Sequence, residues 1–509
     1  MSIESLLSIL LPAVVLLLVF ITKRLILSLV VGLCLGAVFV KYQTPLQIPY
    51  YIFEKFLSVF RYFDEGKMKI NWYAIHIFIF LALLGILPQI FVHSGSINAF
   101  VKWAHSKVKD PRSSEWIIFV AGCVIFIDDQ FNALTLGRSM RPLSDASGLS
   151  RERLAYIIDS TSAPVCILLP LSSWGAYIIG ILNGVLPDPS KSVGILSASI
   201  GLNFYAWFAL FAVFLSILWR IHLPIMRKNF NVGVDKSEIE NQAQKIGSMW
   251  ALIIPILALI FVTLASIITT GYQEAKVWDF RAIVEKTNIS LSVLLGGVSA
   301  TLIGFLLSFK DIEESEYGEI FKEALKISLP SIIILILAWA IGEVVRYDLQ
   351  TGKHLSELIS GVGGENLMFA LPLILFVFSI IIAFATGTSW GCFAVMIPVG
   401  IALAVHNQLD LVVATSAILA GAIYGDHISP ISDTTILTSA GTGCDVQSHF
   451  ITQLPYASIS AICAFVSFAL LSWSKSVLIS YLVGGFLLVG IFYILKRKYE
   501  LKAHSSSMH

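Results

Sequence analysis

Long apolar stretches, separated by short polar ones, recur from one end of the chain to the other. Many are close to the length, about 20 residues, that an α-helix needs to cross a bilayer. They predict transmembrane spans over Leu6–Thr22, Leu25–Val40, Trp72–Phe91, Gly194–Trp219, Trp250–Thr269, Leu291–Ser308, Ile327–Val345, Leu454–Trp473 and Val477–Leu495. Asn98–Val108 is amphipathic and is expected to lie at the membrane surface. The pattern is typical of an all-α polytopic membrane protein.

Two apolar stretches do not fit a simple span. Trp116–Ile127 has about half the required length, and basic residues flank it on both sides, including Lys109 and Arg112 before it and Arg138, Arg141, Arg151 and Arg153 after it. Basic loops favour the cytoplasm, so this stretch must enter and leave on the same side. It predicts a re-entrant helical hairpin over about residues 116–140. A second hairpin is expected over about residues 367–405, with ATGTSWG at its tip.

Two further stretches predict discontinuous transmembrane helices. The first covers about residues 154–183 and contains the motifs IDSTSAP and PLSSWG. The second covers about residues 411–440 and contains GAIYGDHISPISDTT. Pro430 removes a backbone donor and Gly425 loosens the chain, so the helix is expected to break there.

The order of these elements predicts two inverted repeats. Residues 1–223 form the first repeat, 224–248 a cytoplasmic linker, 249–474 the second repeat, and 475–509 an extra terminal helix with a basic cytoplasmic tail. Each repeat has five full crossings, an odd number, so the second must be inverted. A loose local match pairs Asp159 with Asp426. We expect the protein to lie in the inner membrane of the cell. With the N-terminus outside, the chain has 11 spans and two hairpins, and its basic tail lies in the cytoplasm.

Composition agrees with the pattern and narrows the function. Hydrophobic residues make up 57% of the 509 positions and charged residues only 13%, which excludes a soluble globular protein. The net charge of +1 gives no reason to expect a nucleic-acid partner. The six cysteines form no CxxC pair, and there is no nucleophile elbow or phosphate loop, so neither an enzyme nor a bound cofactor is expected.

Five carboxylates fall inside the interrupted elements, namely Asp128, Asp129, Asp159, Asp426 and Asp433. Each would cost roughly 2.5–3.5 kcal/mol if it stayed ionised and unpaired at the membrane centre. No Lys or Arg lies in the same motifs, so the carboxylates must take up a proton, bind a cation or face water. Competition between H⁺ and Na⁺ for one set of oxygens is enough to couple their movements. Asp159, Asp426 and Asp433 are the predicted Na⁺ ligands.

Hydroxyl and amide side chains beside these acids complete the predicted ion- or substrate-binding set. It comprises Asp128, Asp129, Asn132, Asp159, Ser160, Thr161, Ser173, Thr386, Thr388, Ser389, Asp426, Ser429, Ser432, Asp433 and Thr434.

Several members have a structural alternative. Asp128 and Asp129 would also suit the cap of a helix, as would Asp159 at the start of the following half-helix. His427 is either a proton relay or a hydrogen-bonding spacer. Trp174 and Trp390 either pack beside glycines or form the wall of a substrate pocket.

Five motifs resemble the NhaC family of Na⁺/H⁺ antiporters, in the wider ion transporter superfamily. They are FIDDQFN (126–132), IIDSTSAPV (157–165), SSWG (172–175), GTSWG (387–391) and GDHISPISDTTILTSAGTGCD (425–445). The resemblance implies a polytopic inner-membrane protein with two hairpins and Na⁺-coupled transport, and it does not fix the substrate. Gln130 stands where the family pattern leads us to expect an aromatic residue.

The leading hypothesis is therefore Na⁺/H⁺ antiport by alternating access. The alternative is a Na⁺- or H⁺-coupled carrier of an amino acid or small carboxylate, as in malate/lactate exchange, because half-helix N-termini can hold a carboxylate. The lack of Lys and Arg argues against an anionic substrate, and the midplane acids argue against a receptor or scaffold. Expected partners are Na⁺, H⁺, the lipid bilayer and, under the alternative, a small organic solute; a homodimer is left open.

Overall fold

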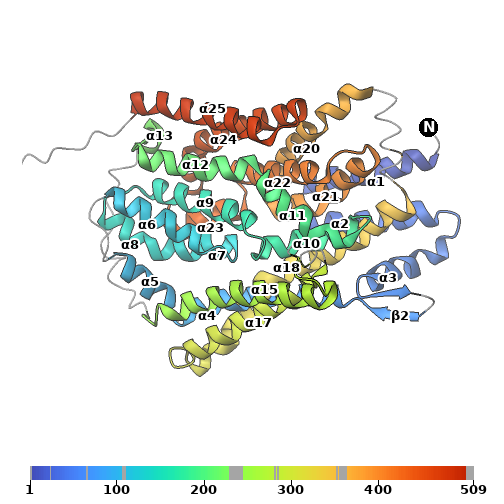
Figure 1. The fold of residues 1–509 in the computed structure, drawn as a ribbon, viewed down its shortest axis with the longest axis horizontal. Helices are drawn as coiled ribbons and strands as arrows, with labels where there is room; N and C mark the ends of the chain where they lie inside the picture. The colour runs from blue at the N-terminus through green and yellow to red at the C-terminus, as the bar shows by residue number, and fades with distance from the viewer. Residues whose placement is uncertain are drawn as a thin grey trace, which may run out of the picture. The chain divides into compact units, whose positions relative to one another are not determined.

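The computed structural model describes residues 3–22, 24–64, 67–105, 111–227, 245–279, 283, 286–350, 354 and 364–499. The described chain is almost entirely helical, with one two-stranded antiparallel hairpin (Figure 1). By length and composition, nine helices among the described residues are suited to crossing a membrane, or ten if one bent pair counts as a single span. The chain is thus a multi-pass helical membrane protein, as the hydrophobic pattern predicts.

The chain divides into two compact units, neither of which is continuous in sequence. Unit 1 comprises Met1–Phe100, Cys166–Asn203 and Gln244–Asp426, and unit 2 comprises Val101–Val165, Phe204–Ala243 and His427–His509. Two of the boundaries between the units, Val165/Cys166 and Asp426/His427, fall inside helices of the interrupted stretches, α9 and α22. The expected division into two inverted repeats stays a prediction.

Unit 1 is a bundle of long helices in which α15 packs on α17, α17 on α4, and α4 on α18. Its elements are α1 (Ile3–Thr22), α2 (Leu25–Lys41), η1 (Pro45–Gln47), α3 (Ile48–Ser58), β1 (Arg61–Asp64), β2 (Lys67–Ile70), α4 (Trp72–His93), the first half of α5 (Ser96–His105), α10 (Ser173–Val185), η3 (Pro189–Lys191), α11 (Ser192–Gly201), α15 (Trp250–Ala275), α17 (Ile289–Ser308), η4 (Glu314–Glu316), α18 (Tyr317–Glu343), η5 (Val344–Asp348), α20 (Gly364–Thr386), α21 (Ser389–His406) and α22 (Leu411–His427).

Unit 2 is built around α24, which packs on α12, α23 and α25. Its elements are α6 (Pro111–Val124), α7 (Asp129–Phe131), η2 (Asn132–Leu136), α8 (Gly137–Ala146), α9 (Arg151–Leu168), α12 (Phe204–Leu218), α13 (Pro224–Arg227), α23 (Asp433–Thr442), α24 (Val446–Ser474) and α25 (Val477–Tyr499). Gly441 lies so close to η2 and α8 that an added Cβ would meet the Leu134 carbonyl oxygen at 2.7 Å, so only glycine fits there.

All four interrupted elements contain a break. The first hairpin has a helical arm, α6, and a second arm, α7 to α8, separated by the non-helical residues Ile125 to Asp128. The predicted second hairpin breaks between α20 and α21, where Gly387 has a φ of +66°, and each of its arms is by itself a candidate span, unlike the short arms expected of a re-entrant hairpin. The first discontinuous helix is α9 followed by α10, with a bend of 44°. The second is α22 followed by α23, and Pro430 lies in the gap between them.

Some elements differ from the prediction. The expected span Gly194–Trp219 corresponds to one candidate span, Pro189–Leu218, although its helix is interrupted at Leu202 and Asn203, between α11 and α12. Helix α5 begins at Ser96, slightly before the predicted amphipathic segment Asn98–Val108. Residues 106–110, which include the end of that segment, lie outside the described residues. Helix α3 and the β1–β2 hairpin were not predicted, because their short, mixed sequences carry no clear period. Most of the predicted linker and basic tail, residues 228–244 and 500–509, also lies outside the described residues.

Candidate functional site

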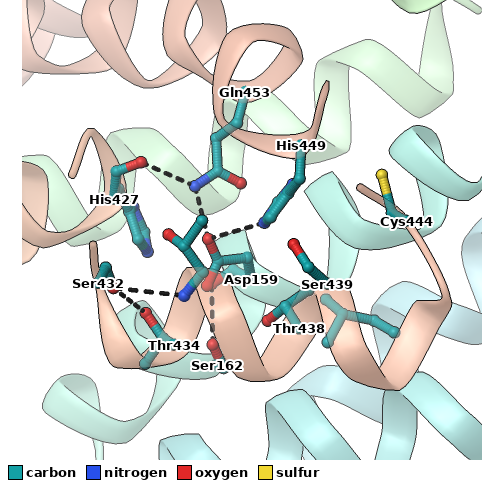
Figure 2. Close-up of polar contacts among 12 residues, drawn as sticks. Asp159, Ser162, His427, Ser432, Thr434, Thr438, Ser439, Cys444, His449 and Gln453 are labelled. Carbon is teal, nitrogen blue, oxygen red and sulfur yellow. Dashed lines mark hydrogen bonds and ion pairs between the residues drawn. The ribbon is translucent and has the colours of Figure 1, made fainter. Parts of the chain in front are cut away.

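Asp159 lies at the centre of a buried polar cluster in unit 2, shown in Figure 2. It sits in the middle of α9 and is fully buried. Its Oδ2 accepts a hydrogen bond of 2.6 Å from Gln453 Nε2, and His449 Nε2 lies 3.3 Å from the same oxygen. The alternative role of Asp159 as a helix cap is wrong, because Ser172 caps the following half-helix by accepting from the Gly175 amide.

Helix α24 brings both partners to the carboxylate. Its start is fixed by Asp445, which accepts a hydrogen bond of 2.9 Å from the Ser448 amide. His449 and Gln453 are four residues apart, so they project from the same face of the helix. Gln453 Nε2 also donates to the backbone oxygen of His427, at 3.0 Å. One amide group therefore connects the carboxylate to the end of α22.

Several oxygens in this cluster are buried without a hydrogen-bond partner among the described residues. They are Asp159 Oδ1, Gln453 Oε1, Thr438 Oγ1 and Ser439 Oγ. Figure 2 draws Thr438 and Ser439, both from α23, in the same polar cluster as Asp159. Buried polar atoms are normally satisfied, and leaving one unsatisfied costs about 1–3 kcal/mol. These oxygens therefore form an environment that a proton or a small cation would stabilise.

No Lys or Arg of the described chain contacts Asp159, and both of its side-chain partners are neutral or titratable. The described residues also contain no group of three or more His, Cys, Asp or Glu side chains placed to hold a metal ion. A Na⁺ site here would consist of one carboxylate and neutral oxygens, which is the ligand type that hard cations prefer.

His427 extends the cluster toward α12. Its Nδ1 lies 2.8 Å from the Tyr205 hydroxyl, and its Nε2 is buried without a partner among the described residues. Both side chains are fully buried or nearly so. The structure thus gives His427 a hydrogen-bonded position next to the Asp159 cluster.

The start of α23 holds most of the remaining predicted residues of unit 2. Ser432 caps the helix by accepting from the Thr435 amide, and its hydroxyl lies 2.9 Å from that of Thr434. Asp433 Oδ2 accepts a bond of 3.0 Å from Gln130 Nε2. Gln130, the residue that departs from the family pattern, thus connects the first hairpin to α23. Ser429 is buried in the preceding turn.

The tip of the first hairpin is held by its own polar residues. Asp128 caps α7 by accepting a bond of 3.0 Å from the Phe131 amide, so the capping role applies to this residue. Asn132 Nδ2 donates to the carbonyl oxygens of Gly122 and Ile125, at 2.8 and 2.7 Å. These carbonyls belong to the end of α6 and its exit, so Asn132 closes the hairpin. Asp129 is fully buried in α7.

Thr161 packs α9 against α6. Its hydroxyl donates to the carbonyl oxygen of Ile157 in its own helix, and a Cβ added at Gly122 would collide with it. Ser160, the neighbouring predicted residue, is buried in the same helix.

In unit 1, the structure brings together Asp426 and Ser389. Asp426 Oδ2 accepts hydrogen bonds from the Ser389 backbone amide, at 3.2 Å, and from its hydroxyl, at 2.8 Å. Ser389 is the first residue of α21, and the N-terminus of a helix stabilises a negative charge. The carboxylate bound at the N-terminus of α21 is therefore that of Asp426, a residue of the protein itself.

The two SWG motifs both begin half-helices of unit 1, α10 and α21. Trp174 and Trp390 are buried and meet edge to face, with ring centroids 6.1 Å apart. Tyr177 donates from its hydroxyl to the Trp390 carbonyl oxygen, at 3.3 Å. This burial agrees with a packing role for the tryptophans. Ser173 is buried beside them, Thr386 ends α20, and Thr388 precedes α21.

Sequence reasoning missed His449, Gln453 and Tyr205. The predicted span began at Leu454, whereas α24 begins at Val446. Two polar residues one turn apart, following an Asp–x–x–Ser cap, were the signal that the helix starts earlier.

Comparison with known proteins identifies the family. Residues 165–473 match the model of the Na⁺/H⁺ antiporter family. The chain belongs to the Na⁺/H⁺ antiporter family. This antiporter is 35% identical to an uncharacterized protein of Haemophilus influenzae over 94% of the chain and 93% of that protein. Shorter matches are to a malate-2H⁺/Na⁺-lactate antiporter of Bacillus subtilis, 32% identical over 38% of the chain and 40% of that protein, and to an uncharacterized Na⁺/H⁺ antiporter of H. influenzae, 28% identical over 32% and 34%.

Two solved transporters share the fold of this antiporter. MtrF of Neisseria gonorrhoeae, described with a class of antimetabolite efflux pumps, aligns with a TM-score of 0.55 over 84% of each chain. YdaH of Alcanivorax borkumensis, described as having an unusual topology, aligns with a TM-score of 0.54 over 88% of this chain and 90% of its own. Each is 13% identical in sequence, so the likeness concerns the fold alone.

Proposed function

We propose that this antiporter exchanges Na⁺ for H⁺ across the cell membrane, with Asp159 carrying either ion in turn. The observation that carries the proposal is the fully buried Asp159 carboxylate, which among the described residues has no Lys or Arg partner and has one oxygen without a hydrogen bond. An uncompensated charge at such a position costs roughly 2.5–3.5 kcal/mol, so the carboxylate is stable only when a cation neutralises it.

The Na⁺ site consists of Asp159 Oδ1 with the hydroxyl oxygens of Thr438 and Ser439, and Gln453 Oε1 is a further oxygen of the same cluster. Gln453 and His449 keep the other carboxylate oxygen in place through their hydrogen bonds. Because H⁺ and Na⁺ occupy the same carboxylate, binding of one releases the other. No further cofactor is needed, and the protein acts as a transporter with no enzymatic step.

Asp426 and Asp433 take supporting roles in this proposal. Asp433 accepts a bond from Gln130, and Asp426 accepts two from Ser389 at the N-terminus of α21, where the helix end stabilises a negative charge. As the sequence indicates, the N-terminus lies outside and the C-terminus in the cytoplasm. Selective labelling of cysteines placed at each end, in intact cells, tests that orientation.

The proposal is tested in proteoliposomes that contain a pH-sensitive dye and no organic solute. An inward Na⁺ gradient should drive protons out of the vesicles containing wild-type protein, and Asp159→Asn should abolish the signal. Asp279→Asn, an exposed acid outside the site, serves as the matched control and should exchange normally. Exchange by Asp159→Asn at the wild-type rate would refute the assignment of the site.

A second candidate function is Na⁺- or H⁺-coupled transport of a small carboxylate. It is favoured by the name of the B. subtilis relative, which exchanges malate and protons for lactate and Na⁺. The same vesicles distinguish the two functions. If a Na⁺ gradient moves protons only after malate or lactate is added, the organic-solute carrier is the correct description.

A further inference from the structure

Unit 1 contains a cavity with a volume of about 580 Å³, and none of the predicted ion-binding residues lines it. Trp72, the first residue of α4, lines it, as do Asn288, which caps α17, and Glu274, near the end of α15. Since these residues lie at the ends of membrane-spanning helices, the cavity lies near a membrane surface and not at the midplane. Its size falls in the range of small-molecule sites, about 300–1,000 Å³.

Among the described residues, the cavity wall carries one carboxylate and one ammonium group. Glu274 and Lys286 both line it, and neither forms an ion pair with the other or with any other side chain in the described ranges. Two opposite charges that share a cavity without meeting leave each available to a ligand. A ligand with a single charge would satisfy one of them and lie near a like charge.

Helix ends reinforce the two charges. Helices α4, α11 and α17 begin at the cavity, through Trp72, Ser192 and Asn288, and the positive ends of helices favour an anionic group. Glu274 instead lies in the last turn of α15, where the negative end of the helix favours a cation.

Side chains in the wall also offer neutral contacts. The Tyr73 hydroxyl is buried and has no hydrogen-bond partner among the described residues, although Tyr73 lines the cavity. His76 is held by Ser290, whose hydroxyl lies 3.1 Å from Nδ1. Trp72 adds an exposed indole ring beside these groups.

We propose that this cavity binds a small zwitterion of the α-amino-acid type, with its carboxylate at Lys286 and its ammonium group at Glu274. Trp72 and Tyr73 give the site a preference for an aromatic side chain. The inference does not depend on Na⁺/H⁺ exchange, since none of the residues proposed for that exchange lines the cavity.

The test is binding of L-phenylalanine to the purified full-length protein in nanodiscs, measured by isothermal titration calorimetry without a Na⁺ gradient. N-acetyl-L-phenylalanine lacks the ammonium group, and phenethylamine lacks the carboxylate. L-phenylalanine should bind at least tenfold more tightly than either analogue. Lys286→Gln and Glu274→Gln should each weaken its binding at least tenfold, and Tyr73→Phe should weaken it a few-fold.

The variants also change selectivity in a way that a folding defect would not. Glu274→Gln should lose the preference for L-phenylalanine over its N-acetyl derivative, and Lys286→Gln the preference over phenethylamine. Lys310→Gln and Glu319→Gln, exposed residues outside the cavity, serve as matched controls and should bind normally. Absence of L-phenylalanine binding at millimolar concentration, or wild-type affinity in both cavity variants, would overturn the proposal. Na⁺/H⁺ exchange, measured separately without organic solute, would be unaffected by that outcome.

Discussion

Arg153 and Asp159, two buried ionisable groups of helix α9, have opposite surroundings. Arg153 is fully buried, and its Nε donates a bond of 2.8 Å to Glu115 of α6. His222 lies 3.3 Å from the same carboxylate oxygen, and Ser216 accepts a bond from Arg153 Nη2. Asp159, six residues further along α9, has Gln453 and His449 as its side-chain partners in the described part of the chain.

The proposed function makes this a difference between a structural charge and an exchangeable one. A fixed arginine neutralises Glu115 permanently, and the pair joins two helices of unit 2. Asp159 has no such countercharge among the described residues, so in the proposed function its neutralisation depends on an ion that can leave. Similar low-dielectric surroundings then hold a fixed ion pair in one cluster and, as proposed, an exchangeable ion in the other.

The largest effect is expected from breaking the fixed pair. Arg153→Met leaves the Glu115 carboxylate buried without its countercharge, which should destabilise the protein by about 3–5 kcal/mol. The melting temperature of the purified protein measures this loss. Glu115→Leu combined with Arg153→Met removes both charges and should recover most of the stability. If Arg153→Met alone were as stable as the double variant, the Arg153–Glu115 ion pair would not be what holds the two helices together.

A smaller effect, on ion binding, is expected at Gln453. Gln453→Ala removes the donor to the ionised Asp159 and one of the cluster's oxygens, at a cost of about 1.5–3 kcal/mol, or roughly 10–100-fold. The Na⁺ concentration that gives half-maximal exchange should rise by that factor. Gln447→Ala, an exposed residue on the same helix, is the matched control. Equal values for the two variants would remove Gln453 from the site.

The smallest effect is expected at Asn132, which the sequence places in the binding set and the structure uses to close the hairpin. Asn132→Leu leaves two buried carbonyls without their side-chain donor, so the melting temperature should fall by an amount equivalent to about 1–3 kcal/mol. In the exchange assay, the half-maximal Na⁺ concentration should stay near the wild-type value. A selective loss of Na⁺ affinity at unchanged stability would return Asn132 to the ion site.

The sequence was sufficient to predict the interrupted helices, because polar motifs and glycine or proline residues stand out within apolar stretches. It also placed Asp159 among five candidate acids, with Asp426 and Asp433 as the other predicted Na⁺ ligands, since a carboxylate without a nearby base is conspicuous in such a segment. It could not reveal the partners of Asp159, because Gln453 is distant in sequence and was assigned to the region before a span. Arg153 was grouped with basic flanking residues, although it is buried, because its partner Glu115 lies 38 positions away.

The most direct test of the exchangeable charge is the effect of Na⁺ on stability. A ligand that binds only the folded protein stabilises it, by about 2.7 kcal/mol at 100 times its dissociation constant. The melting temperature of wild-type protein should therefore rise as Na⁺ replaces choline at constant ionic strength, and that of Asp159→Asn should not change. If Na⁺ raised both melting temperatures equally, Asp159 would not be the residue that holds the ion.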